Sequence, residues 1–320
     1  MFHRLFILLT IFAFPAVGQA PFWEVEWPNT DFSKTSVNFV DIISGGPPRD
    51  GIPALNEVDF LPVDGVDIPE NEPVVTVEID GQDPRAYPIR YLTWHEIAND
   101  MIGDVPVAVT FCPLCNSALV FDRRVNGRVL SFGVSGKLRN SDMIMFDRQS
   151  ESWWQQFTGE AIVGDLLGAK LTQIVSWMEP MSEFRARNPD GLVMAEPTGY
   201  RRMYGANPYT GYERGQPFLY TGEDPPYGIN ALSRVIRVGN RVWPLERLQN
   251  VEELEEAGVR IVWKSGMAAA LDTRRISDAR DIGSIRVYDA VTGDDVLHEV
   301  VFAFAFHAFV PDGEWMLGNQ

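Results

Sequence analysis

Short extended segments separated by turn residues run through most of the chain, and they constrain its fold more than any other feature. Val105–Phe111 is an apolar run of strand length, and Ala118–Asp122 and Arg128–Val134 lie on either side of Asn126-Gly127. An Asn-Gly pair between two extended segments is a typical β-hairpin sequence. Tyr91–Ile102 instead has apolar residues near helical spacing and ends before a glycine, which predicts a helix. The pattern predicts an α+β fold in which β-strands dominate.

Two parts of the chain show the same order of segments. Ala86-Tyr-Pro-Ile89 precedes the predicted helix and the strand at 105–111, and Val242-Trp-Pro-Leu245 precedes a helix-like stretch at 246–257 and a strand at 259–263. Self-similarity of this kind is the sequence signature of an internal repeat. We therefore expect two related but unequal copies, a degenerate internal duplication, that form one compact unit.

The expected organisation of the chain has five parts. They are a signal peptide at 1–20, an irregular N-terminal arm at 21–72, a first copy at 73–199, a connector at 200–237 and a second copy at 238–320. The connector is dense in Tyr, Gly and Pro, and its aromatic content is high for a flexible linker. We expect it to be ordered, with tyrosines able to line a cleft.

The first twenty residues have the composition of a secretory signal. A basic residue, Arg4, precedes an apolar run at 5–17, and Gly18-Gln-Ala20 provides small residues at the positions that a signal peptidase reads. The run is too short to span a bilayer as a helix, and no later segment is long enough. Val300–Val310 comes nearest, but its alternation of Phe with Ala indicates a strand. We therefore expect cleavage after Ala20, a mature chain without a transmembrane segment, and a periplasmic or secreted location.

The charge balance narrows the range of partners. The chain has 44 acidic and 27 basic residues and a formal net charge of −17. Such a charge repels nucleic acids, so no nucleic-acid partner is expected. No Walker loop or dinucleotide-binding fingerprint occurs, so no nucleotide cofactor is expected either. The net charge and the missing motifs leave a protein or a small molecule as the partner, and they do not show which one it is.

Several longer motifs follow one another between Arg85 and Met194. They are Arg85-Ala-Tyr-Pro88, Trp94-His-Glu-Ile97, Val109-Thr-Phe-Cys-Pro-Leu-Cys-Asn-Ser-Ala118, Phe132-Gly-Val-Ser-Gly136, Asn140-Ser-Asp142, Met145-Phe-Asp-Arg-Gln149 and Thr158-Gly-Glu-Ala161. In identity and order they resemble those of DUF3179, a bacterial and archaeal family known only as a domain of unknown function. Asp50-Gly-Ile-Pro-Ala-Leu55 upstream is also similar to the family. The resemblance implies no activity, so the residues themselves must indicate the chemistry.

Cys112-Pro-Leu-Cys115 is the most informative motif, and it has three interpretations. A metal site would use both thiolates, although a four-cysteine zinc site is excluded because the chain has only two cysteines. A structural disulfide would suit an oxidising compartment. A thiol-disulfide oxidoreductase would need a helix after the first cysteine to lower its pKa, and the following residues instead lead into a hairpin.

The metal interpretation needs further ligands, and His95 is the first candidate. A helix at 92–102 packed antiparallel to a strand at 105–112 would return Cys112 close to His95. Glu96 or a methionine, Met143 or Met145, would be the fourth ligand, and a thioether would favour Cu(I) over zinc. We therefore expect copper or zinc bound by Cys112, Cys115, His95, Glu96 and Met145.

A second group of polar residues follows the cysteines. Its members, which carry guanidinium, amide or carboxyl groups, are Arg123, Arg139, Asn140, Asp142 and Arg148. Arginine side chains bind anions through paired hydrogen bonds, so the group is a candidate contact for an anionic substrate. Such residues also form structural ion pairs at strand ends.

Three functions remain open at this point. Metal handling at the Cys-x-x-Cys and His site is favoured, as a carrier or as the cofactor site of an enzyme. The alternatives are a non-catalytic binding or assembly module with a structural disulfide, and an extracytoplasmic thiol-disulfide oxidoreductase. The sequence does not decide whether the protein is an enzyme.

Overall fold

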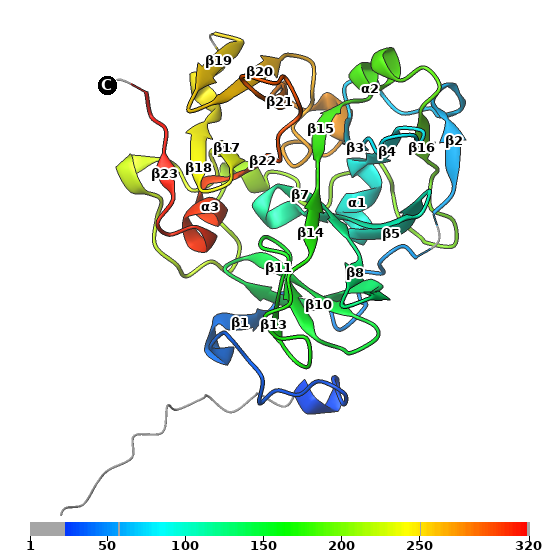
Figure 1. Cartoon of the computed structure of the whole chain (residues 1–320), viewed down its shortest axis with the longest axis vertical. Coiled ribbons are helices and arrows are strands. Elements are labelled where there is room, and N and C mark those ends of the chain that lie inside the picture. Colours follow the sequence, from blue (N-terminus) through cyan, green and yellow to red (C-terminus); the bar gives the residue numbers. More distant parts are fainter. Residues whose placement is uncertain (1–22, 57, 250, 319–320) are drawn as a thin grey trace, which may run out of the picture.

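The computed structural model describes residues 23–56, 58–249 and 251–318. The predicted signal peptide and its cleavage site lie outside the described residues. Within them, five β-sheets of three to five strands and one two-stranded ribbon form a five-bladed, propeller-like arrangement (Figure 1). The only α-helices of the described part have seven residues each; they are α1 (Ile89–His95), α2 (Met181–Arg187) and α3 (Ala303–Phe309). The fold is therefore mostly β, and the expected α+β class is wrong.

Two sheets build the site described below. The first, the cysteine sheet, has in hydrogen-bonded order β14 (Thr172–Ile174), β7 (Ser117–Asp122), β6 (Val105–Cys112) and β5 (Ile97–Ile102). The second, the Asp142 sheet, has β1 (Ile42–Ser44), β10 (Phe132–Arg139), β11 (Asp142–Asp147), β12 (Trp153–Gln155) and β13 (Glu160–Val163). The ribbon is β8 (Arg124–Val125) with β9 (Arg128–Val129). A hairpin therefore turns at Asn126-Gly127 as expected, but only these two-residue strands pair. The predicted pairing of 118–122 with 128–134 is wrong, because β7 and β10 lie in different sheets.

Three further sheets complete the fold. The first has β15 (Ser176–Pro180), β3 (Pro73–Val77), β4 (Arg85–Pro88), β16 (Leu192–Met194) and β2 (Phe60–Pro62). The second has β22 (Glu299–Phe302), β17 (Arg234–Val238), β18 (Arg241–Pro244) and β23 (Glu314–Trp315). The third has β19 (Glu253–Glu256), β20 (Val259–Lys264) and β21 (Ser284–Asp289). Short 3₁₀ turns connect these elements; they are η1 (Trp23–Val25), η2 (Phe39–Asp41), η3 (Val63–Gly65), η4 (Pro113–Cys115), η5 (Tyr212–Arg214), η6 (Pro226–Gly228), η7 (Leu245–Arg247) and η8 (Ile276–Asp278).

The expected division into two related copies is wrong as a description of this fold. Strands from 73–199 are spread over three sheets, and two of these sheets also take strands from the predicted N-terminal arm, β1 and β2. The remaining two sheets come from the C-terminal part of the chain. The sequence similarity that suggested two copies is local. In both places a strand that ends in proline, β4 or β18, leads into a helical turn, α1 or η7.

Three predicted elements have the wrong type. The helix expected at 91–102 ends at His95, because Glu96 takes a left-handed conformation (φ 59°), and Ile97–Ile102 pairs along its whole length with β6. The helix-like stretch at 246–257 contains strand β19. The strand expected at 300–310 is helical from Ala303, and Ala303–Phe306 is buried on all sides. A segment without a polar face gives no period by which to distinguish helix from strand.

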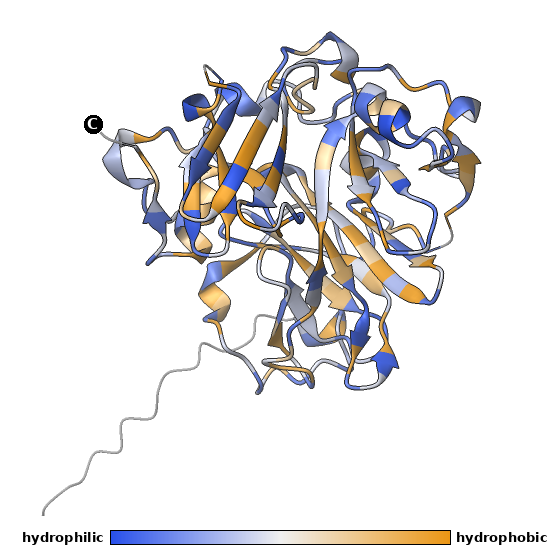
Figure 2. Cartoon of the chain, turned by 45° about the horizontal axis from the view of Figure 1, so that its top comes forward, coloured by the Kyte–Doolittle hydropathy of each residue, from blue (hydrophilic) through white to orange (hydrophobic). Residues whose placement is uncertain are grey.

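The strands supply a continuous apolar core. The main hydrophobic cluster contains residues from Ala54 to Phe306, including Cys112 and Cys115, and the hydrophobic colouring follows the strands in Figure 2. Burial of this surface is the main favourable contribution to folding. No helix in the described ranges is long and apolar enough to cross a membrane.

Candidate functional site

Two hairpin tips meet where the cysteines lie. Strand β6 ends at Cys112, a single 3₁₀ turn carries Pro113–Cys115, and Asn116 closes the turn in a left-handed conformation before β7. The hairpin of β10 and β11 turns at Asn140 and Ser141, which have φ values of 50° and 63°. Asn and Ser tolerate such values better than bulky residues. Both tips are therefore tight turns whose side chains have fixed positions.

Both cysteines are free thiols in the interior. Their exposed fractions are 1% for Cys112 and 0% for Cys115. Their sulfur atoms lie 4.0 and 3.7 Å from the carbonyl oxygen of Ser141. Burial raises the pKa of Cys112, and burial together with the neighbouring Cys112 thiol raises the pKa of Cys115 well above its ordinary value. The two thiols are therefore protonated at neutral pH unless a cation stabilises their thiolates.

Asp142, the first residue of β11, faces the two cysteines. Its Oδ2 accepts hydrogen bonds from the side-chain amide of Gln155 at 2.7 Å and from the backbone N–H of Phe157 at 3.0 Å. Its Oδ1 is buried and has no donor within ordinary hydrogen-bond distance in the described part of the chain, and the nearby thiols of Cys112 and Cys115 act only as weak donors to the carboxyl. Burial raises the pKa of Asp142 to about 6, although these donors and the two thiols oppose the shift. The carboxyl is thus held in place on one side and is free to bind a ligand on the other.

The three groups are close enough to share one metal ion. One ligand atom from each of Cys112, Cys115 and Asp142 lies within 4.8 Å of the other two, and all three residues are buried. Tetrahedral zinc has ligand bonds of roughly 2.0–2.3 Å, so its ligand atoms lie somewhat less than 4 Å apart. Small side-chain movements would therefore bring the cluster to coordination distance. The sequence placed Asp142 in the anion group and missed its relation to the cysteines, because a contact between two hairpin tips leaves no signal in residue spacing.

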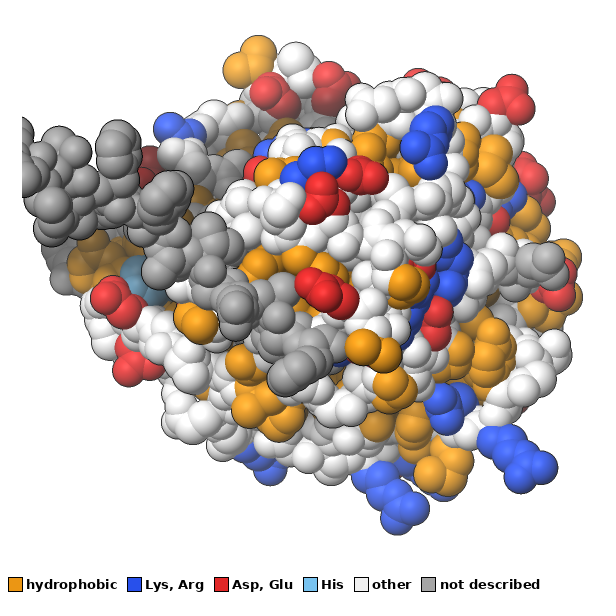
Figure 3. Space-filling model, turned by 90° about the horizontal axis from the view of Figure 1, so that it is seen from below, with side chains coloured by type: hydrophobic (Ala, Val, Ile, Leu, Met, Phe, Trp, Pro, Cys, Tyr) orange, Lys and Arg blue, Asp and Glu red, His pale blue; other side chains and the backbone are white. Residues whose placement is uncertain are grey.

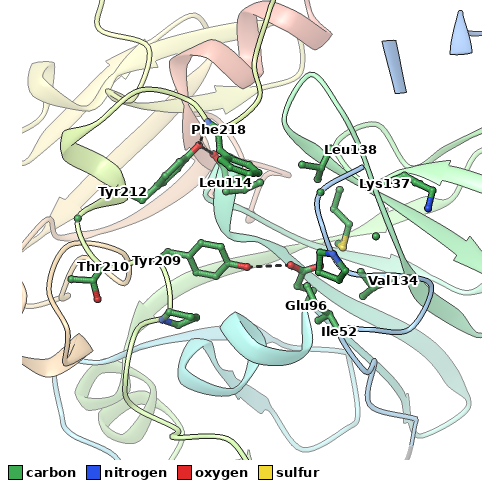
Figure 4. A pocket seen from close by; sticks show the side chains of 16 residues that line it. Ile52, Glu96, Leu114, Val134, Lys137, Leu138, Tyr209, Thr210, Tyr212 and Phe218 are labelled. Atoms are coloured by element: carbon green, nitrogen blue, oxygen red, sulfur yellow. Dashed lines mark hydrogen bonds between the residues drawn. The ribbon is translucent and has the colours of Figure 1, made fainter. Parts of the chain in front are cut away.

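A cavity of about 450 Å³ lies beside this cluster. Its wall includes the residues next to the ligand positions, namely Leu114 and Met143. The connector supplies Tyr209, Tyr212 and Phe218, which lie on the same side as Leu114 and across the cavity from Ile52 and Val134 (Figure 4). The expected cleft lined by tyrosines of the connector is therefore present. Hydrogen bonds fix the ring of Tyr212, since its hydroxyl donates to the carbonyl of Leu114 at 2.9 Å and accepts from the N–H of Phe218 at 3.2 Å.

Glu96 also lines the cavity, and its carboxyl is almost entirely buried, with 7% of the residue exposed. The hydroxyl of Tyr209 donates to its Oε1 over 3.4 Å (Figure 4). Burial raises the pKa of Glu96 to about 8, and the nearby Asp142 carboxyl adds to the shift. Glu96 therefore carries a proton at neutral pH in the chain alone. It is near the cysteine cluster but is not part of it.

His95 does not join the cysteines. Its Nδ1 lies 2.7 Å from the carbonyl oxygen of Pro53, which only accepts, so this nitrogen carries the proton and donates. Its Nε2 then accepts from the hydroxyl of Tyr204 at 2.7 Å. Burial lowers the pKa of His95, which keeps the ring neutral. Hydrogen bonds to Pro53 and Tyr204 thus engage both ring nitrogens, and neither is directed at the cysteines.

The methionines occupy different places. Met143 lines the cavity, and Met145 is fully buried in the main hydrophobic cluster, opposite Val134 and Trp154 on the neighbouring strands. The structure thus brings together Cys112, Cys115 and Asp142, with Glu96 nearby, and assigns Met145 a packing role.

The predicted anion group is divided between the two ends of the β10–β11 hairpin. Arg139, Asn140 and Asp142 lie at its tip, and the side chain of Arg139 reaches Gln155. At the other end Arg123 donates to the carbonyls of Val107, Leu130 and Asp100, and Arg148 pairs with both oxygens of Asp50. These arginines are engaged within the protein. The face shown in Figure 3 likewise carries basic, acidic and hydrophobic side chains side by side.

Comparison with known proteins identifies the family. The family described as "Protein of unknown function (DUF3179)" matches residues 49–313. The chain belongs to the DUF3179 family. The match spans both hairpin tips, the connector and the cavity wall apart from Gly45 and Pro47, so the cysteine cluster and most of the surrounding wall lie within the DUF3179 region. Searches among curated proteins and among solved structures found no match to the chain.

Proposed function

We propose that this DUF3179 protein binds a zinc ion through the thiolates of Cys112 and Cys115 and the carboxylate of Asp142. The observation that carries the proposal is a buried cluster of three potential anions, one of which has an oxygen without a described donor at ordinary hydrogen-bond distance. A buried charge is costly unless it is paired or coordinates a metal. Zinc binding would release the protons of these groups and replace three unfavourable ionisations by coordination bonds.

The donor set favours zinc over copper. Thiolate and carboxylate oxygen are both zinc ligands, whereas Cu(I) prefers thiolate and thioether sulfur. The thioether of Met145 lies in the apolar core, and its place among the ligands is taken by Asp142. Three protein ligands with a fourth position for water or substrate is the arrangement of catalytic zinc sites. A substrate that enters the adjacent cavity would occupy this fourth coordination position.

Burial argues against thiol exchange as the function. Exchange needs an accessible thiolate with a lowered pKa, and here both thiols are buried with raised pKa values. Neither cysteine precedes an α-helix, since the turn after Cys112 has only three helical residues. The structural disulfide remains the competing interpretation, and a metal measurement separates it from the zinc site.

The test is metal content by mass spectrometry with thiol titration, on protein purified after export and without chelators. We expect close to one zinc per chain and two thiols that become titratable after chelation. Cys115→Ser and Asp142→Asn should both lose the zinc. Asp312→Asn, at an exposed position that is not part of the cluster, is the control and should retain it. Wild-type protein that has neither metal nor titratable thiols would instead be the disulfide form and would refute the zinc proposal.

We also propose that the protein is exported and acts in the periplasm or outside the cell. The support is the sequence of the first twenty residues, with its basic start, short apolar run and small residues before Pro21. Mass spectrometry of the protein from cell fractions should find a mature N-terminus at Pro21 in the exported fraction. An intact N-terminus in the cytoplasmic fraction alone would contradict export.

A further inference from the structure

The carboxyl group of Glu96 has an unusual environment for a buried acid. In the part of the chain that the structure describes, the other buried carboxyls apart from Asp142 and Asp147 have an arginine partner. Examples are Glu72 with Arg90, Glu179 with Arg187 and Glu213 with Arg234. For Glu96, the described residues provide only the hydroxyl of Tyr209, at 3.4 Å, and no ion pair. Its backbone is also in the left-handed region, with φ 59°, which a non-glycine residue adopts at a cost.

The cavity that Glu96 faces is lined by aromatic and other apolar groups. Tyr209, Tyr212 and Phe218 contribute rings, and Met143 contributes a polarisable thioether (Figure 4). Of the cavity-wall residues that the structure describes, Lys137 is the only basic one, and its ammonium group is bound to Glu26 at 2.9 Å. Among the described residues, the cavity therefore presents one carboxyl group, several aromatic rings and no available cation.

We infer that this cavity binds an organic ammonium cation with an apolar body, with its charge between the carboxyl of Glu96 and the rings of Tyr209, Tyr212 and Phe218. A cation is the partner that a buried carboxylate requires and that the protein does not provide. Aromatic faces attract cations through the ring quadrupole, most strongly where water is excluded. A volume of about 450 Å³ is in the range of small-molecule pockets. An anionic ligand would meet no positive group here.

This inference goes beyond the zinc site and does not depend on it. Glu96 is outside the cluster of Cys112, Cys115 and Asp142, and the aromatic residues come from the connector. Three thiolate or carboxylate ligands around a divalent ion leave a net negative charge, so occupied zinc ligands would not repel an ammonium group. The binding experiment is therefore performed on the full chain both as purified and after chelation.

The experiment is calorimetric titration with a panel of ligands that differ in charge at constant shape. Choline is compared with its neutral isostere 3,3-dimethylbutan-1-ol and with the anion 3,3-dimethylbutanoate, and benzyltrimethylammonium and benzylamine extend the panel. We expect at least one of the three ammonium compounds to bind, and we expect choline to bind at least about tenfold more tightly than its isostere. The anion should show no binding.

Variants assign the binding to this cavity. Glu96→Gln keeps the shape of the side chain and removes its charge, and it should weaken ammonium binding at least about tenfold. Phe218→Leu, at a residue that is partly exposed, should weaken it several-fold without affecting folding. Glu255→Gln, on an exposed position of β19, is the matched control and should bind as the wild type does. Circular dichroism checks that each variant is folded.

Several outcomes would overturn the inference. These are equal binding of choline and its neutral isostere, unchanged ammonium binding in both Glu96→Gln and Phe218→Leu, or no binding of any ammonium compound at millimolar concentration. Failure of the zinc measurement with retained ammonium binding would refute the proposed function alone. The opposite result would refute only the present inference.

Discussion

Two buried glutamates have opposite environments in this protein. Glu179, on β15, has 2% of its surface exposed and accepts hydrogen bonds from Thr76 and from both terminal nitrogens of Arg187. Glu96, beside the cavity, is about as buried but has only the hydroxyl of Tyr209 as a partner. The first carboxylate is neutralised by the protein. The second keeps its proton because burial raises its pKa to about 8.

The difference separates buried polar groups that stabilise the fold from buried polar groups that are available for a function. A buried ion pair with complete hydrogen bonds contributes to a defined fold, and removing one partner is costly. A buried acid without a partner costs stability when it ionises, and perturbed groups of this kind gather at functional sites. The cysteine cluster resembles Glu96 in this respect. Among the described residues, the thiols of Cys112 and Cys115 and the Oδ1 of Asp142 also lack a positively charged partner. The same amino acid should therefore respond to the same substitution with opposite sign at the two positions.

The largest effect is expected for Glu96→Gln, measured as a function of pH on chelated protein. The native state holds the proton of Glu96 up to about pH 8, whereas the unfolded chain releases it near 4.5. The native state therefore binds more protons in this interval, and the wild-type free energy of unfolding falls as pH rises through it. Gln cannot ionise, so the variant should gain about 3–5 kcal/mol relative to wild type between pH 4.5 and 8.5. Urea unfolding at both pH values measures this gain.

A flat difference between the two proteins across this pH range would show that Glu96 ionises in the native state as easily as in the unfolded chain. Glu255→Gln is the control and should follow the wild-type curve, because its side chain is exposed.

Glu179→Gln should have the opposite sign and a smaller size. It leaves Arg187 without its buried counter-ion, although the arginine is 31% exposed and keeps Glu78 as a partner. We expect a loss of about 3 kcal/mol in the free energy of unfolding at pH 7, at the lower end of the range for a broken buried pair. Glu78→Gln removes the more exposed carboxylate of the same arginine and should cost less than about 1 kcal/mol. Equal losses in the two variants would show that burial does not distinguish the pairs.

The candidate site was only partly predictable from the sequence. Cys112 and Cys115 stand out because they are the only cysteines, and the tyrosines of the connector stand out by their density. The partner of the cysteines could not be predicted, because Asp142 reaches them through the meeting of two hairpins 26 residues or more apart in sequence. His95 was favoured because a helix was expected to run from 92 to 102. The helix instead ends at His95, because Glu96 takes a left-handed backbone conformation. No residue pattern reports such a conformation.

The fold shows the same limits. The turn at Asn126-Gly127 and single strands such as β6 were predicted because their pattern is local. The arrangement into five sheets was not, since β3 pairs with β15 about a hundred residues later and β17 pairs with β22 about 65 residues later. Fully buried segments such as Ala303–Phe306 also gave the wrong type, because no exposed face revealed their period.

His95→Ala tests whether His95, which lies outside the cysteine cluster, contributes to zinc binding. Its ring is fully buried and bonded to Pro53 and Tyr204, so its loss should lower the free energy of unfolding by about 2 kcal/mol. Zinc content per chain should stay at the wild-type value, because neither ring nitrogen faces the cysteines. Asp142→Asn provides the contrast and should lose zinc. A loss of zinc in folded His95→Ala would show that the ring turns toward the cluster when metal is bound.

Arg148→Ala should have the smallest effect of the set. Its guanidinium forms two hydrogen bonds of 2.8 and 2.9 Å with Asp50, but both side chains are about one-third exposed, so water replaces much of what the pair provides. We expect a cost below about 1 kcal/mol and no change in zinc content. A double-mutant cycle with Asp50→Asn measures the coupling of the two groups directly. A coupling energy well above about 1 kcal/mol would mean that good hydrogen-bond geometry can compensate for exposure to water. Burial alone would then no longer separate the polar groups that maintain this fold from those that remain available for a ligand.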